Sequence, residues 1–186
     1  MLRAVVLAVA ALSLSLTPAS AKVKPHVPPF RMPTGWPVSI TIPTIKVKAM
    51  VEHLALNGPK AVDAPFKWGD VGWYDLSARP GAIGHAIMFG HLDSTCCPAV
   101  FWLLKDLKPR QTIWIQYKWK KPLQFRVMWT KDYPDSHLPT KFMYGSTTQR
   151  GLILFTCSGV FHYDGSGYDH KIVVYARLVM PGNKLG

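Results

Sequence analysis

The sequence predicts an all-β domain that folds as a barrel or a sandwich. Two observations indicate this class: seven or eight short runs are rich in β-branched and aromatic residues, and Gly, Pro, Asp or Lys pairs separate most of them. With 186 residues, of which 48% are apolar and 17% charged, the chain is the right size for one domain with a genuine core. We see no internal repeat and no second domain in the sequence.

The expected strands follow one another after residue 37. The first, "VSITIP", alternates strictly between apolar and polar residues, and "IKVKAMVEHLAL" alternates less strictly. The others are the runs "AIMFG", "TIWIQYKW", "LQFRVMWT", "LILFTC" and "IVVYARLV". One segment, "PAVFWLLKDL", predicts a helix of about two turns, because Pro98 suits a first helical position and five apolar side chains share one face.

The two ends of the chain differ from this pattern. Residues 1–21 predict a signal peptide, since a basic residue, a short apolar segment and an A-x-A cleavage site follow in order. The apolar segment is short for a membrane span, which needs about 20 residues, although an uncleaved anchor stays open. Residues 22–37 hold five prolines and predict an extended linker. We therefore expect an extracytoplasmic domain at 38–180 and a tail at 181–186.

The charge is strongly basic. Twenty-two Lys and Arg residues against ten Asp and Glu give a formal net charge of +12. This balance favours anionic surroundings such as a phospholipid surface or a cell-wall polymer. The basic residues are spread along the chain, and no RNP-type, zinc-finger or helix-turn-helix signature accompanies them, so no nucleic-acid partner is expected.

Three cysteines cannot all pair with one another within a single secreted chain. Cys96 and Cys97 are adjacent, where a mutual disulfide is expected to be strained. Cys157 ends the apolar run "LILFTC", so we expect it at the end of a strand. Core filling, a disulfide, a metal ligand and a nucleophile are all open for this thiol.

His91 is the histidine best placed to assist a nucleophile. It follows the short apolar strand "AIMF" and a glycine, so two strands of one sheet could end on reactive side chains at the same rim. A nucleophilic Cys needs such an acid or base, because a free thiol is only a few per cent ionised at pH 7. A surface His in a turn is the alternative for His91 alone, whereas the two strand-end patterns together favour a site with Cys157.

Two other classes of protein compete with an enzyme. A zinc site could be drawn from some of the His and Cys residues, but adjacent Cys and a His-x5-His spacing match no tetrahedral site. The candidate ligands are His85, His91, Cys96, Cys97, His162 and His170. A catalytically weak or noncatalytic basic β-barrel that binds anionic cell-surface polymer also fits the charge and the fold.

The motifs resemble those of the sortases, the cysteine transpeptidases of Gram-positive surfaces. "LILFTCSG" carries Leu-x-Thr-Cys at Leu154, Thr156 and Cys157, and "VGWYDLSARPGAIGHAIMFGHLDS" is similar to the family stretch around the catalytic His. "IPTIKV" and "PAVFWLLKDLKPRQTIWI" match further segments, so the likeness spans about Ile42 to Val179. It is closest to the actinobacterial subgroup often called class F or class E.

This resemblance implies a closed eight-stranded sortase-type barrel with one or two short helices. Cys157 would attack an LPxTG-like sorting signal and form a thioester, which an amine of a cell-wall precursor or a pilin-like protein resolves. His91 would act as general acid and base, and Thr156 would shape the substrate groove. The chemistry requires no metal and no cofactor. The family setting also implies a secreted or membrane-anchored protein close to the outer face of the cytoplasmic membrane.

The match fails at the third catalytic element of the family, an Arg on the strand after the Cys. The corresponding segment here is "GSGYDHKIVVYARLV". His170 or Lys171 is expected to take the place of the Arg, and the spacing from Cys157 slightly favours His170. Neither offers the planar, permanently charged fork of a guanidinium. A second hypothesis concerns "STCCPAVF": Cys96 or Cys97 forms a reversible disulfide that masks Cys157.

Overall fold

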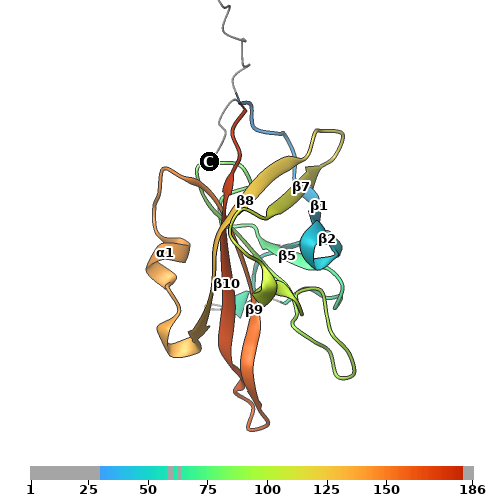
Figure 1. Cartoon of the computed structure of the whole chain (residues 1–186), viewed down its shortest axis with the longest axis vertical. Coiled ribbons are helices and arrows are strands. Elements are labelled where there is room, and N and C mark those ends of the chain that lie inside the picture. The colour runs from blue at the N-terminus through green and yellow to red at the C-terminus, as the bar shows by residue number, and fades with distance from the viewer. Residues whose placement is uncertain (1–29, 58–60, 63, 182–186) are drawn as a thin grey trace, which may run out of the picture.

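The computed structural model describes residues 30–57, 61–62 and 64–181. Eight strands form a closed barrel in the order β1-β2-β5-β6-β9-β10-β8-β7, which confirms the predicted barrel (Figure 1). Two pairs, β2 with β5 and β6 with β9, are parallel, and the other neighbours are antiparallel. The barrel strands are β1 (Pro37–Ile42), β2 (Val47–Leu54), β5 (Val71–Tyr74), β6 (Gly84–Phe89), β7 (Thr112–Tyr117), β8 (Leu123–Pro134), β9 (Arg150–His162) and β10 (Gly167–Leu178). A separate two-stranded sheet pairs β3 (Leu56–Asn57) with β4 (Ala61–Val62).

Alternating side chains fill the barrel. On β1, Ile40 and Ile42 point inward and are fully buried, as the strict alternation of "VSITIP" predicts. The largest buried side chains include Trp73 of β5, Phe125 of β8 and Phe101 from the loop after β6. β5 is missing from the expected strands because its four residues are buried or nearly so and show no alternation.

A second apolar cluster covers the outer face of β6, β9 and β10. It contains Ile87, Ile153, Val173 and Tyr175, and Met143 of the short helix α1 (Thr140–Tyr144) packs against them. Figure 1 shows α1 beside the barrel. Five residues are too few for a visible helical period, so the sequence did not reveal this helix. The middle of β9 is thus buried on both faces, which explains the continuous apolar run of "LILF".

The predicted helix at "PAVFWLLKDL" is wrong. This segment contains turns and one 3-10 helix, η2 (Leu104–Asp106). Its first amides bind carbonyl oxygens from distant segments: Val100 donates to Trp68 at 3.0 Å, and Phe101 donates to His91 at 3.0 Å. The later amides form bonds three residues back, from Trp102 to Ala99 at 3.1 Å and from Leu104 to Phe101 at 2.9 Å, so the apolar side chains reach the core from turns and a 3-10 helix. Two further 3-10 helices are η1 (Pro43–Ile45) and η3 (Asp135–His137).

Cys157 does not end a strand, contrary to the expectation from "LILFTC". β9 continues through His162 and forms a long hairpin with β10 that projects from the barrel, at the bottom of Figure 1. The polar composition of residues 158–170 hid this extension, because a solvated hairpin arm needs no apolar face. In the part of the chain that the structure describes, no helix has the length and apolar character required to cross a membrane.

Candidate active site

The parallel pairing of β6 with β9 brings His91 level with Cys157. Every paired position in this ladder differs by 66, from Gly84 with Arg150 to Phe89 with Phe155. The Gly90 amide extends the pattern by donating to the Phe155 carbonyl oxygen at 3.3 Å. His91 and Cys157 are also 66 positions apart, so the same register places them side by side at the end of the paired segment.

Thr156 holds this register from inside the barrel. Its side chain is 2% exposed, and its hydroxyl donates to the Gly90 carbonyl oxygen at 2.8 Å. Gly90 leaves no room for a larger residue, because a Cβ there would lie 2.6 Å from Cγ1 of Val100. Thr156 therefore fixes the residue that precedes His91. Thr156 does not line the pocket shared by His91 and Cys157, but it lines an adjacent pocket of about 330 Å³ that has Leu92, Asp93 and Tyr168 in common with it.

Two neighbours orient the His91 ring. The ring lies 4.2 Å from the Trp68 ring at an interplanar angle of 56°, and Nε2 is 2.9 Å from the Pro65 carbonyl oxygen. A carbonyl oxygen only accepts, so Nε2 carries the hydrogen of this bond. In the neutral ring Nδ1 is then unprotonated. The fold thus selects the tautomer in which Nδ1 can take up a proton.

Cys157 is a free, half-buried thiol. Burial raises its pKa, because the thiolate loses solvation, and the positive charge of Lys171 partly opposes this effect. The carboxylates of Asp135 and Asp93 raise the pKa further. The thiol form therefore predominates at neutral pH.

His91 and Cys157 line one pocket with a volume of about 760 Å³. A hydrogen bond of 2.6 Å from the Tyr168 hydroxyl to Asp93 joins the β9–β10 hairpin to the loop after His91. This bond raises the pKa of Tyr168 to about 12. Apart from His91 and Cys157, the residues of this pocket were not predicted from the sequence, since they come from three segments whose closeness depends on the fold. The lining consists of Trp68, His91, Leu92, Asp93, Ser94, Thr95, Cys157, Phe161, Tyr163 and Tyr168.

Comparison with known protein families identifies the fold and its family. The Sortase domain model matches residues 40–179. The chain belongs to the sortase family. Among solved structures, it is similar to a lid mutant of sortase A from Corynebacterium diphtheriae, with a TM-score of 0.59, 22% identity, and coverage of 80% of this chain and 73% of that one. It is also similar to sortase C-1 from Actinomyces oris, with a TM-score of 0.60, 19% identity and coverage of 76% and 71%. A search of curated proteins found no match.

The sortase resemblance implies a cation on β10, and the two candidates, His170 and Lys171, lie on different faces of that strand. Lys171 pairs directly with Cys157, whereas His170 pairs with Ser158. Directly opposed side chains in an antiparallel ladder lie on one face, and neighbours along a strand alternate. Lys171 therefore shares the face of Cys157, and His170 belongs to the other face.

A bulge sets this pairing. The register shifts between Tyr168 and His170, where Gly159 adopts a positive φ of 80° on the opposite strand. Gly159 and Val160 form the bulge on β9, and the single residue opposite them, Asp169, accepts a hydrogen bond from the Val160 amide at 2.8 Å. Counting from the hairpin without the bulge would put Ile172 opposite Cys157.

Both candidate cations of this sortase already contact a carboxylate. Nζ of Lys171 lies 2.8 Å from Oδ1 and 2.9 Å from Oδ2 of Asp135, and the Lys171 side chain is 18% exposed. Nδ1 of His170 lies 2.9 Å from Oδ1 of Asp169. This contact raises the pKa of His170.

The proposed disulfide between Cys157 and the "STCCPAVF" loop is wrong. Cys96 and Cys97 are bonded to each other, and Cys157 is free. The loop brings these two sulfurs together through a tight turn in which the Ser94 amide donates to the Cys97 carbonyl oxygen at 2.8 Å. Among the described residues, no group of three or more His, Cys, Asp or Glu side chains is arranged to hold a metal ion.

Proposed function

We propose that this chain is a cysteine transpeptidase that cleaves an LPxTG-like sorting signal through a thioester on Cys157. The observation that carries the proposal is that a free thiol on β9 and His91, two residues beyond the end of the neighbouring parallel strand β6, line one pocket of about 760 Å³. Such a volume suits a short peptide segment, since ligand pockets span about 300–1,000 Å³. Membership of the sortase family supports the reaction class.

In the acylation step, His91 takes the proton of the Cys157 thiol at Nδ1, and the sulfur attacks the carbonyl carbon of the Thr in the sorting signal. The peptide C–N bond breaks, and protonated His91 donates its Nδ1 proton to the leaving amine. The products are a thioester on Cys157 and the released C-terminal fragment. The hydrogen bond from Nε2 to Pro65 supports this role, because it keeps the ring oriented while Nδ1 exchanges its proton.

In the second step, an amine attacks the thioester carbon. Neutral His91 takes a proton from the amine, a new amide bond forms, and the sulfur of Cys157 leaves. The acceptor is an amine of a cell-wall precursor or of a pilin-like surface protein. Water in place of the amine gives slow hydrolysis.

We assign Lys171 as the substitute for the family Arg, in preference to His170. Its position opposite Cys157 on the same face supports a role in stabilising the thiolate and the developing oxyanion. An ammonium group is a point charge and cannot bind two oxygens in the planar manner of a guanidinium. Thr156 acts as a positioning residue through its hydrogen bond to Gly90, and it also lines the pocket adjacent to that of His91 and Cys157.

The finer assignments extend the family resemblance. We propose a member of the class F or class E subgroup that works at the outer face of the cytoplasmic membrane, either anchored or secreted. Its partners are the sorting-signal peptide of a surface protein and the amine acceptor. The exposed aromatic side chains Phe161 and Tyr163, which line the pocket, support a peptide partner.

The decisive experiment detects the covalent intermediate. The chain is incubated with a panel of fluorogenic LPxTG-type peptides, and mass spectrometry looks for the acyl group on Cys157. We expect an acyl adduct on Cys157 in the wild type and no adduct in Cys157→Ala. His91→Ala should retain a folded barrel but lose turnover. Turnover that persists in Cys157→Ala would disprove the proposal.

A weakly catalytic or noncatalytic barrel that binds anionic cell-surface polymer is the second candidate. One observation favours it: the only cation opposite Cys157 in the β9–β10 ladder already binds Asp135. Binding to polyglycerol phosphate that is equal in the wild type and Cys157→Ala, together with no acyl adduct for any peptide, would favour this candidate.

A further inference from the structure

The turn between β7 and β8 presents a tryptophan to solvent. Trp119 is 89% exposed and has a φ of 57°, in the left-handed region that side chains other than Gly and Asn rarely adopt. The turn is held by a hydrogen bond of 3.2 Å from the Lys120 amide to the Tyr117 carbonyl oxygen and by the side-chain amide of Gln116. The backbone of this turn therefore holds the Trp119 ring in solvent. The ring makes no contribution to the core, so its exposure needs another explanation.

Lysines surround this ring. Lys118, Lys120 and Lys121 are exposed, and Nζ of Lys118 lies 5.7 Å from the Trp119 ring centroid. Trp and Lys together suit a membrane–water interface, where the ring enters the headgroup layer and the ammonium groups meet anionic lipids.

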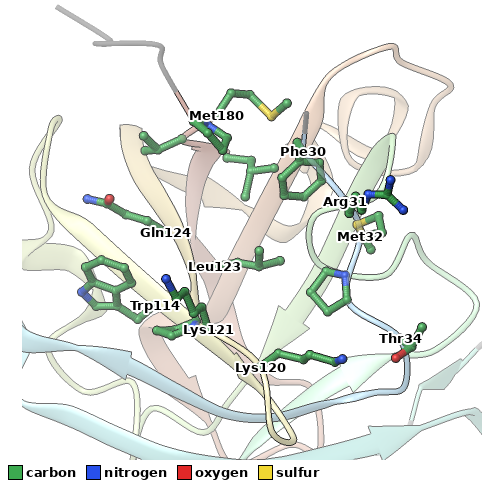
Figure 2. A pocket seen from close by; sticks show the side chains of 15 residues that line it. Phe30, Arg31, Met32, Thr34, Trp114, Lys120, Lys121, Leu123, Gln124 and Met180 are labelled. Carbon is green, nitrogen blue, oxygen red and sulfur yellow. The ribbon is translucent and has the colours of Figure 1, made fainter. Parts of the chain in front are cut away.

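The tip of this hairpin adjoins an apolar pocket of about 900 Å³ at the same end of the barrel (Figure 2). Figure 2 shows Lys120 and Lys121 on one side of it, with Phe30 and Met180 on another and Leu123 between them. We call residues 30–34, 118–124 and 178–181 the basic face. These three segments contain Arg31, Lys118, Lys120 and Lys121 and no Asp or Glu.

Half of the ten acidic residues lie around Cys157 or on the β9–β10 arm, away from the basic face. They are Asp93 in the loop after β6, Asp132 on β8, Asp135 in η3, and Asp164 and Asp169 on the arm. Seven residues of β10 separate Lys171, opposite Cys157, from Leu178 in the apolar pocket, a span of about 23 Å at 3.3 Å per residue. The lysine opposite Cys157 is thus paired with a carboxylate, Asp135, whereas the basic residues of the basic face have no acidic residue in their own segments.

The chain also enters the barrel at the basic face. Phe30, the first residue that the structure describes, lines the apolar pocket. In Figure 1 the blue segment that begins there and the β7–β8 hairpin both lie at the top, opposite the β9–β10 arm. Thirteen residues, 17–29, separate Phe30 from the expected apolar leader. In the extended polyproline II conformation, thirteen residues span roughly 40 Å at about 3.1 Å per residue.

We propose that the basic face docks on the anionic headgroups of a phospholipid surface, with Trp119 in the interfacial layer. Docking in this orientation directs the pocket of His91 and Cys157 away from the membrane. The proposal is independent of catalysis, because no residue of the basic face lines the candidate active site.

The test is quenching of tryptophan fluorescence by brominated lipids, with the full chain and vesicles of equal parts phosphatidylcholine and phosphatidylglycerol. We expect quenching of the wild type that is lost in Trp119→Phe and kept in Trp102→Phe, a matched control because Trp102 is 41% exposed and lies in the loop after the active-site His. The leader is present in every variant, so its insertion cannot produce this difference. Equal quenching of the wild type and Trp119→Phe would overturn the proposal.

Charge variants test the headgroup contact. Replacing Lys118, Lys120 and Lys121 by Gln should weaken docking by roughly 100-fold, the loss expected from three surface lysines near anionic lipid. The control replaces Lys46, Lys48 and Lys108 by Gln, which removes the same charge from exposed positions outside the basic face. Equal effects of both triple variants would indicate nonspecific attraction and contradict the proposal. If vesicles do not quench Trp119 and polyglycerol phosphate shifts the tryptophan emission spectrum, the partner is a wall polymer and the proposal is overturned.

Discussion

Lys171 lies directly opposite Cys157 in the β9–β10 ladder, and Asp135 binds its ammonium group with both carboxylate oxygens, at 2.8 and 2.9 Å. The cation that lowers the pKa of the thiol is therefore accompanied by a carboxylate that raises it. Burial raises that pKa as well, and the raised pKa leaves Cys157 largely protonated at neutral pH. In this candidate site, the positive charge of Lys171 favours the thiolate of Cys157, but burial and the carboxylates of Asp135 and Asp93 favour the protonated thiol.

Removing the carboxylate should activate the thiol. We expect Asp135→Asn to lower the pKa of Cys157, because a like charge is lost and the ammonium group of Lys171 is released. Alkylation by iodoacetamide, followed against pH, should shift to lower pH and run roughly 3- to 10-fold faster at pH 7, as expected for up to one pKa unit. Lys171→Met should shift the same curve to higher pH. Asp164→Asn at the hairpin tip is the control, and an equal shift in that variant would contradict this explanation.

Turnover should depend on Lys171 more than on His170. Lys171→Met removes the positive charge on the face of Cys157, so we expect kcat/KM for a sorting-signal peptide to fall by roughly 100-fold. Lys171→Arg should retain activity or increase it, because the guanidinium keeps the charge and presents its N–H donors in a planar fork that can bind two oxygens. His170→Gln should change kcat/KM by less than about threefold, a small fraction of that loss. The reverse order of effects would return the role to His170.

The sequence predicts the site more fully than it predicts the surroundings of the site. His91 and Cys157 each follow an apolar run, and their separation of 66 positions equals the offset of the β6–β9 ladder. The choice between His170 and Lys171 could not be made from the sequence, because the bulge at Gly159 shifts the register by one residue. A one-residue shift moves every later side chain to the other face.

Other parts of the fold depend on contacts between distant segments. Alternation predicts strands such as β1, but a barrel and a sandwich share that pattern, so closure of β7 onto β1 was implied only by the family resemblance. The segment "PAVFWLLKDL" forms turns and a 3-10 helix instead of the expected α-helix, and hydrogen bonds to the carbonyl oxygens of Trp68 and His91 tie it to the barrel. Helical periodicity carries no information about such partners.

The thiols should differ in their response to reduction. In the oxidised chain, alkylation under denaturing conditions should modify Cys157 alone, because Cys96 and Cys97 are bonded to each other. Mild reduction should add two modified sites and leave the extent of labelling at Cys157 unchanged. Peptide mapping by mass spectrometry checks both results. An increase in Cys157 labelling on reduction would show that a mixed disulfide had masked it.

Thr156 should contribute both to stability and to the geometry of the site. Thr156→Val keeps the shape of the side chain but removes the hydroxyl, which leaves the buried Gly90 carbonyl oxygen without this donor. We expect the free energy of unfolding to fall by about 1–3 kcal/mol, measured by denaturant titration. Because Gly90 immediately precedes His91, kcat should also fall while KM changes little. Thr156→Ser keeps the hydroxyl and should restore most of both quantities. Loss of stability with unchanged kcat in Thr156→Val would show that the bond supports the barrel and does not position His91.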